Sequence, residues 1–186
     1  DTGYDANIKI PAIISCYRTP GLATHDSKVL QLLSSYLSGG ASSKLFKKMV
    51  DDKKNALQVG AFNLALEDYG SYIPFALPNN NTPLPTLLKD IDDEVAKVQT
   101  DLISEQDYKK LMNKAENDFV NNNTSMQGVA GNLSNSYIFH KNTNYINNEL
   151  IEIRKITREE IRSVAQKYLN KNQRVVLYYL PKSSDQ

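Results

Sequence analysis

The sequence predicts an α+β fold, in which helices pack on one face of a largely antiparallel sheet. Three observations support this class. A run of alternating apolar residues near the N-terminus indicates a strand, two further strands follow as a hairpin, and long stretches of helical periodicity precede a final strand. Strands and helices therefore come in separate groups, which is typical of α+β domains and not of alternating parallel-sheet folds.

The overall composition is that of an ordinary globular chain. The 186 residues are 40% hydrophobic and 23% charged, and the net charge is +1. Such a balance gives no reason to expect a nucleic acid or an anionic membrane as partner. No apolar run approaches the roughly 18 residues of a membrane span. We interpret residues 1–186 as a single domain and, because the chain begins without methionine, expect it to be a fragment of a longer protein.

The first strand is expected over residues 8–17, where the side chains alternate with a period of two. Ile14 and Cys16 share one face of this strand, and Ile13, Ser15 and Tyr17 share the other. The lone cysteine, Cys16, is interpreted as a small buried hydrophobic residue. A helix is expected next, from His25 or Asp26 to Leu37, with Thr24 or Asp26 as its cap, and the pair Gly39-Gly40 should end it. A short helix from Ser42 or Ser43 to Asp51 follows.

Residues 55–67 and 71–77 are predicted to form two strands joined by a turn at residues 67–70. The apolar side of the first strand changes parity near Gly60, which predicts a β-bulge there.

The second half of the sequence is mostly helical. An apolar stripe marks a helix from Thr82-Pro83 to Leu102, and Ser104 with Asp107 opens another. A weaker helical pattern covers residues 126–139. Thr157 and Glu160 have the spacing of a capping box at the start of a further helix. Residues 174–180 are predicted to form a strand buried on both faces, or nearly so.

The sequence contains none of the common hydrolase motifs. The two histidines, His25 and His140, lie far apart, and the HEXXH, HXXEH and GXSXG patterns do not occur. We therefore expect no catalytic residue and no metal ligand in this chain. Ser42-Ser43 after Gly39-Gly40 could suggest a phosphate cradle, but the GK[ST] ending is missing. A helix end followed by a helix cap is the preferred interpretation.

Charged residues form two notable runs. The acidic run contains Asp90, Asp92, Asp93 and Glu94, and it is interpreted as a solvated helix face. The basic cluster contains Lys47, Lys48, Lys53 and Lys54. A solvated helix end is the default interpretation for it, with a contact to an anion or a peptide carboxylate as the alternative.

Three segments together resemble one known family. They are residues 10–20 with Leu37-Ser38-Gly39-Gly40-Ala41-Ser42-Ser43-Lys44-Leu45-Phe46, then residues 102–107, then residues 153–169 with the strand 174–180. In this order they resemble the C-terminal domain of pitrilysin/insulinase-type zinc peptidases, the group that includes mitochondrial processing peptidase. The resemblance covers nearly the whole chain.

The resemblance implies a division of labour between two domains. In that family two similar α+β domains form a clamshell around an unfolded peptide, and the N-terminal domain carries HXXEH and a distant glutamate. The C-terminal domain holds no metal and forms the opposite wall. We therefore expect a non-catalytic domain whose partner, in the same chain or in a paired subunit, holds the zinc ion. Bacterial members suggest the periplasm or cell envelope. A scaffold module without proteolytic role is the alternative, and an unrelated small-molecule enzyme would require a polar pocket.

One departure from the family pattern concerns the substrate wall. Many members place an arginine and, seven residues later, a tyrosine after the glycine-serine segment, where they hold substrate near zinc. Aligned on Leu45-Phe46, these positions are Val50 and Leu57, whose side chains cannot donate hydrogen bonds. With Lys53 and Lys54 between them, they are the candidate wall residues of this chain.

Overall fold

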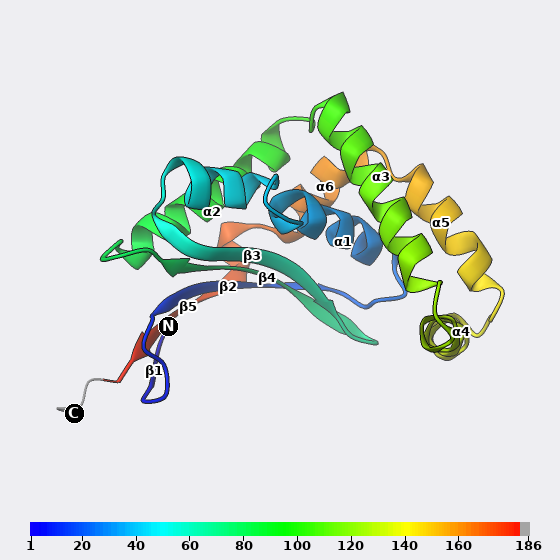
Figure 1. The fold of residues 1–186 in the computed structure, drawn as a ribbon, viewed down its shortest axis with the longest axis horizontal. Helices are drawn as coiled ribbons and strands as arrows, with labels where there is room; N and C mark the ends of the chain where they lie inside the picture. Colours follow the sequence, from blue (N-terminus) through cyan, green and yellow to red (C-terminus); the bar gives the residue numbers. More distant parts are fainter. Residues whose placement is uncertain (183–186) are drawn as a thin grey trace.

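A computed structural model describes residues 1–182 as a five-stranded sheet with helices stacked on one side (Figure 1). The elements in chain order are β1 (Thr2–Asp5), β2 (Ala12–Pro20), α1 (His25–Ser38), the π-helical segment η1 (Phe46–Asp52), β3 (Ala56–Ala65), β4 (Tyr69–Pro78), α2 (Leu84–Thr100), α3 (Glu105–Asn122), α4 (Met126–His140), α5 (Tyr145–Lys155), α6 (Arg158–Tyr168), the short 3-10 segment η2 (Lys171–Gln173) and β5 (Arg174–Pro181).

The strand order is β1-β5-β2-β4-β3, and each neighbouring pair is antiparallel except β1 with β5. The final strand therefore lies between the first two, which joins the beginning and the end of the chain through the sheet. The predicted α+β class and the largely antiparallel sheet are confirmed.

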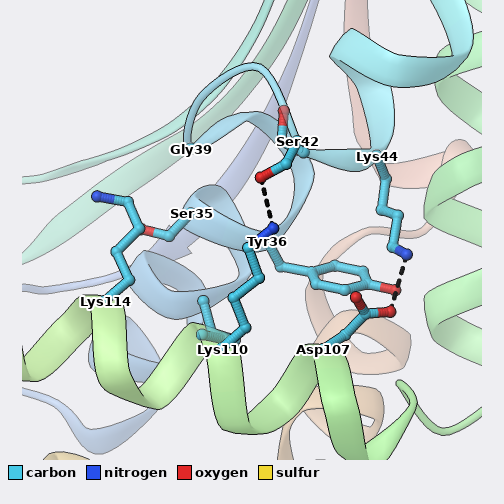
Figure 2. A pocket seen from close by; sticks show the side chains of 10 residues that line it. Ser35, Tyr36, Gly39, Ser42, Lys44, Asp107, Lys110 and Lys114 are labelled. Atoms are coloured by element: carbon cyan, nitrogen blue, oxygen red, sulfur yellow. Dashed lines mark hydrogen bonds and ion pairs between the residues drawn. The ribbon is translucent and has the colours of Figure 1, made fainter.

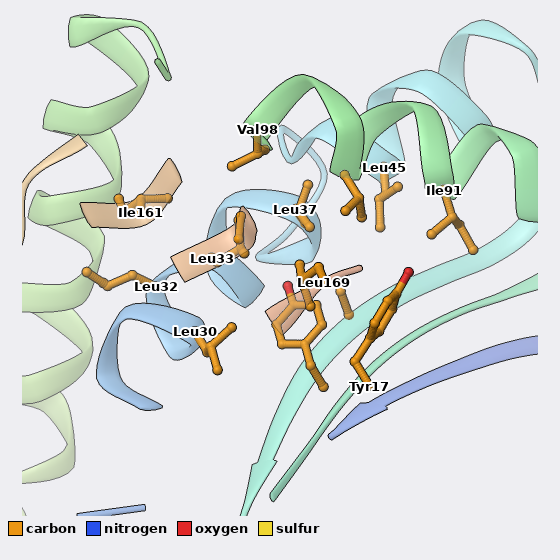
Figure 3. Packing of buried hydrophobic residues seen from close by; sticks show 14 of the residues in the cluster. Tyr17, Leu30, Leu32, Leu33, Leu37, Leu45, Ile91, Val98, Ile161 and Leu169 are labelled. Atoms are coloured by element: carbon orange, nitrogen blue, oxygen red, sulfur yellow. The ribbon is translucent and has the colours of Figure 1, made fainter. Parts of the chain in front are cut away.

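The helices form two layers on the same side of the sheet. α1, α2 and α6 contact the strands directly, while α3 packs on α1, α5 on α3, and α4 on α5 (Figure 1). The core lies between the sheet and the inner layer, where Leu33 of α1, Ile91 of α2 and Ile161 of α6 are fully buried (Figure 3). Burying one such side chain contributes about 1.5–3 kcal/mol.

Most predicted helix ends agree with the structure, but α2 begins at Leu84, with Pro83 and not Thr82 at the N-cap position and no side-chain cap. The side chain of Thr24 accepts a hydrogen bond from the Ser27 amide at the start of α1, and Gly39-Gly40 ends that helix. Ser104 caps α3 through the Asp107 amide (3.1 Å). Thr157 and Glu160 form the predicted capping box at α6, each accepting from the other's amide.

The two faces of β2 are the reverse of what its apolar residues suggest. Ile13, Ser15 and Tyr17 are buried under the helices, while Ile14 and Cys16 lie half-buried on the other face. The expectation that Cys16 is a buried residue was therefore wrong, because its side chain is only half-buried. Tyr17 spans the core with its ring and brings its hydroxyl to Arg174 (2.9 Å), which explains why a residue with a polar tip takes the inner position.

A bulge does interrupt β3, but at Leu57 and not near Gly60. The pairing with β4 shifts between Ala56 and Gln58, so Leu57 is the extra residue. Gly60 has another role. A Cβ atom on Gly60 would lie 2.2 Å from the ring of Phe75, so the glycine makes room for that ring.

Three elements, β1, α5 and η2, were not predicted. β1 has only four residues and η2 only three, which is too short for a periodic pattern, and α5 carries no buried residue, so it lacks a strong apolar stripe. The last strand was predicted as buried on both faces, but Val175 is 60% exposed. One face of β5 is covered by helices, and the other is open.

Candidate functional site

The helix-free face of the sheet, called the open face below, is apolar. On β3 and β4 it presents aromatic and aliphatic side chains, and the same chemistry continues across β2 and β5. Its apolar members are Ala12, Ile14, Cys16, Phe62, Leu64, Ile73, Phe75, Leu77, Val175, Leu177 and Tyr179. Phe62, Leu64 and Val175 are 43%, 48% and 60% exposed.

An antiparallel sheet with one solvated face normally alternates apolar and polar residues. Here both faces are apolar, and within residues 1–182 no helix covers the open face (Figure 1). Phe62 and Phe75 meet edge to face across β3 and β4, with ring centroids 6.3 Å apart. A broad apolar surface of this kind indicates contact with another protein surface or with a bound chain.

The four candidate wall residues lie at one corner of the fold, where η1 leads into β3. Their side chains lie in different environments. Val50 is half-buried and packs against the core, whereas Leu57 is 53% exposed at the bulge. Lys54 adopts a left-handed backbone conformation (φ 51°), and its carbonyl accepts from the Asn79 side chain at 2.8 Å.

Lys53 does not extend freely into solvent. Its ammonium forms an ion pair with Asp90 of α2, which also accepts from the Asn55 side chain at 2.8 Å. Burial raises the pKa of Asp90, but the hydrogen bonds from Lys53 and Asn55, together with the charges of Lys48 and Lys53, outweigh it and hold that pKa below its usual value.

Two lysines of the basic cluster, Lys48 and Lys53, form ion pairs with the acidic run, although each run was expected to be a solvated face. Asp90, Asp92 and Glu94 are 2%, 7% and 5% exposed, so the interpretation of this run as a solvated face was wrong. Lys48 lies 3.6 Å from Asp90 and 3.3 Å from Glu94. These ion pairs hold η1 against α2 and so support the corner where the candidate wall residues lie. They also occupy the Lys48 ammonium.

Neither histidine is part of a site for metal. His25 lies 3.0 Å from Glu160, and His140 stacks on Tyr145 with ring centroids 3.6 Å apart. Across residues 1–182, no three histidine, cysteine or carboxylate side chains are placed to hold a metal ion together. The donors present therefore do not fit a zinc site.

A hollow at the end of α1 tests the phosphate-cradle alternative (Figure 2). Lys110 donates to Ser42 (2.6 Å), Lys44 pairs with Asp107 (2.8 Å), and Lys114 pairs with Asp118 (2.8 Å). Each of these ammonium groups already has a partner within the chain. This favours a structural role for the segment over a phosphate cradle.

The preferred interpretation, a helix end followed by a helix cap, holds in part. Gly39-Gly40 ends α1, as predicted. The Ser43 hydroxyl, however, is buried without a hydrogen-bond partner in the described part of the chain, so it does not act as the predicted cap.

Comparison with known proteins identifies the family. The sequence profile described as the peptidase M16 inactive domain matches residues 3–115. The chain belongs to the peptidase M16 inactive domain family. Over 115 residues it is 31% identical to the "Zinc protease PqqE" of Helicobacter pylori, which covers 62% of this chain and 26% of that protein.

Solved structures show that the M16 inactive-domain fold extends over almost all of the chain. A protease from Helicobacter pylori matches with a TM-score of 0.88 at 23% identity, covering 96% of this chain and 43% of that one. The inactive peptidase domain of a putative zinc protease from Bordetella parapertussis matches with a TM-score of 0.82 at 17% identity, over 96% of both chains. The chain thus spans less than half of the Helicobacter proteins it matches.

The fold is shared by proteins of different kinds. The periplasmic protease PqqL of Escherichia coli matches at a TM-score of 0.73 and 16% identity, over 98% of this chain and 20% of that one. A chain of complex III2 from Candida albicans matches at 0.80 and 11% identity, over 97% of this chain and 45% of that one. Within residues 1–182, none of the helices has the length and apolar character needed to cross a membrane.

Proposed function

We propose that this M16 inactive domain forms the non-catalytic wall of a peptide-binding chamber, opposite a zinc-bearing catalytic domain. The open face is the observation that carries this proposal. Its apolar side chains offer contacts to an extended peptide without selecting one sequence, as expected for a protease acting on unstructured peptides. Zinc and its activated water would come from the partner domain, in the same chain or in a paired subunit.

In this proposal the corner where η1 leads into β3 helps to shape the chamber wall but, Lys54 apart, donates no hydrogen bond to the transition state. Val50 and Leu57 lack donors, and Lys53 is engaged with Asp90. Apart from the exposed Lys54 ammonium, donors aimed at the reacting carbonyl would therefore come from another domain. The periplasmic PqqL and the zinc protease PqqE, both matched above, support a bacterial protease working in the periplasm or envelope.

A test uses the full-length protein that contains this chain together with its zinc-bearing domain. Phe62→Ser with Leu64→Ser removes two exposed apolar side chains from the β3 edge of the open face. The matched control is Met126→Ser, which removes an apolar side chain that is 94% exposed on α4. We expect the double variant to raise KM for a fluorogenic unstructured peptide several-fold, with kcat and bound zinc nearly unchanged, and the control to match the wild type.

Two results would contradict the proposal in different ways. If the wild-type full-length protein holds zinc but cleaves no unstructured peptide, the scaffold alternative is correct. If the protein is an active peptidase and the double variant keeps its KM, the open face is not the substrate wall.

A further inference from the structure

A polar hollow lies on the helical side of the molecule, away from the open face. It consists of two adjoining spaces of about 210 and 300 Å³ that share Lys28 of α1, Asn132 of α4 and Glu149 of α5. Small-molecule sites in proteins commonly begin at about 300 Å³. The hollow is therefore large enough for a small metabolite, and it plays no part in the function proposed above.

Helical spacing brings polar side chains to this hollow from three helices. On α5, Tyr145, Glu149 and Ile153 recur every four residues and so share one face. α4 presents Asn132 and Ser136 with the same spacing. Packed helices normally bury an apolar stripe, yet α5 has no buried residue and α4 buries only Ser136. The helices thus leave a polar space between them.

Lys28 and Glu149 bring opposite charges to the hollow but do not meet, while Asp118, which also lines it, pairs with Lys114 (2.8 Å). Lys28 donates to the Tyr145 hydroxyl, and its ammonium lies 4.8 Å from the centre of that ring. Glu149 is half-buried, and within residues 1–182 its carboxylate makes no hydrogen bond and no ion pair. Burial raises the pKa of Glu149, and the nearby Lys28 charge partly offsets this effect. A half-buried carboxylate without a partner is unfavourable unless something binds it.

We propose that this hollow binds a small zwitterion, a free amino acid or dipeptide with an apolar side chain, with the ligand carboxylate at Lys28 and its ammonium at Glu149. A molecule with a charge at each end satisfies both protein charges at once, which neither an anion nor a cation alone can do. Leu22 and Phe139 supply an apolar wall for the side chain, and the Asn132 and Asn135 amides can bind the backbone of the ligand.

The test measures binding to the 186-residue chain by calorimetry and by NMR chemical-shift mapping. The Bordetella domain, matched over 96% of both chains, was crystallised at about this length, which supports using this chain by itself. The probes are L-leucine and leucyl-glycine, with N-acetyl-L-leucine and L-leucine methyl ester as controls that lack one charge each. We expect saturable binding of at least one zwitterion, no binding of the capped compounds, and shift changes around Asn132 and Tyr145.

Two variants assign the two ends of the ligand. Lys28→Gln and Glu149→Gln should each weaken binding about tenfold or more, the effect of losing one charge-assisted hydrogen bond. Lys47→Gln and Glu67→Gln, at exposed positions outside the hollow, should bind like the wild type. Thermal unfolding shows whether each variant is folded, and the wild-type shift map decides if a variant is not.

Three results would overturn the assignment. They are no binding of either zwitterion to folded wild-type chain, equal binding of the capped compounds, and shift changes confined to residues outside the hollow. The proposal is independent of the chamber-wall function, because a scaffold protein could hold the same ligand. Failure here would therefore leave the peptide-cleavage test of the full-length protein unaffected.

Discussion

Arg174, the first residue of β5, forms a two-pronged ion pair with Asp92 in α2. Its Nη1 donates to Oδ1 of Asp92 and its Nη2 donates to Oδ2 (3.0 Å), while the Tyr17 hydroxyl also accepts from Nη1 at 2.9 Å. The two charged side chains are 9% and 10% exposed. The hydrogen bond with Asp92 raises the pKa of Arg174, so the guanidinium keeps its charge. It ties the last strand to a helix that lies 82 positions earlier in the chain.

Removing one partner of this ion pair should lower the free energy of unfolding. Asp92→Ala leaves the Arg174 charge buried without its partner, and we expect the free energy of unfolding to fall by about 3 kcal/mol. Replacing both residues, with Asp92→Leu and Arg174→Met, should recover most of that loss, because no buried charge remains. Urea unfolding followed by circular dichroism measures both. A double variant as unstable as the single one would show that the pair itself, and not the stranded charge, matters.

Acid sensitivity should depend on Asp90. Its folded-state pKa lies below the unfolded value of 3.8, so ionised Asp90 stabilises the folded chain above about pH 4. That contribution is lost as the pH falls through the lowered pKa. Asp90→Asn should reduce stability at pH 7 by about 2 kcal/mol, the loss of charge-assisted hydrogen bonds.

The pH profile of the variant provides the sharper check. Because Asn does not titrate, the difference between wild type and Asp90→Asn should shrink between pH 4 and pH 2. Asp51→Asn, at an exposed position in η1, should follow the wild-type curve. A difference that stays constant down to pH 2 would mean that the Asp90 charge does not stabilise the fold.

The sequence predicted the fold wherever a local pattern and its packing agree. The caps at Thr24, Ser104 and Thr157 are local chemistry, and each forms as expected. The two faces of β2 were harder to assign, because apolar residues lie on both. Which face the helices cover is decided by distant segments, and both faces of this sheet are apolar.

The candidate site was less predictable for the same reason. The acidic run of α2 has the local pattern of a solvated face. It is buried because Lys48 and Lys53, which lie 42 and 37 positions from Asp90 in the sequence, pack against it. The hollow brings together Lys28 of α1 and Glu149 of α5, which lie more than 100 residues apart in the sequence. No local spacing pattern predicts such a pair. One signal was available: Tyr145, Glu149 and Ile153 repeat at helical spacing in a segment where no helix was predicted.

Gly60 should be sensitive to the smallest substitution. A Cβ atom there would lie 2.2 Å from the Phe75 ring, so Gly60→Ala forces the ring to move. We expect a loss of about 1–3 kcal/mol in the free energy of unfolding. Gly131→Ala in α4 is the matched control, since a Cβ there meets nothing within 4 Å, and it should stabilise the chain by about 0.5–1 kcal/mol. Combining Gly60→Ala with Phe75→Leu should restore part of the loss. If Gly60→Ala leaves the free energy of unfolding unchanged, the Phe75 ring can move aside without cost.

Two leucines on opposite faces of the sheet separate stability from function. Leu33 is fully buried between α1 and the sheet, whereas Leu64 on the open face is 48% exposed. Leu33→Ala should lower the free energy of unfolding of the isolated chain by about 2–5 kcal/mol, because it removes buried methyl groups and leaves a cavity. Leu64→Ala should change it by less than about 0.5 kcal/mol, as surface substitutions usually do. In the full-length protein, however, Leu64→Ala should weaken peptide binding while Leu33→Ala should mainly lower the yield of folded protein. If Leu64→Ala destabilises the isolated chain as strongly as Leu33→Ala, the open face belongs to the core of this domain and is not a surface held for a partner or substrate.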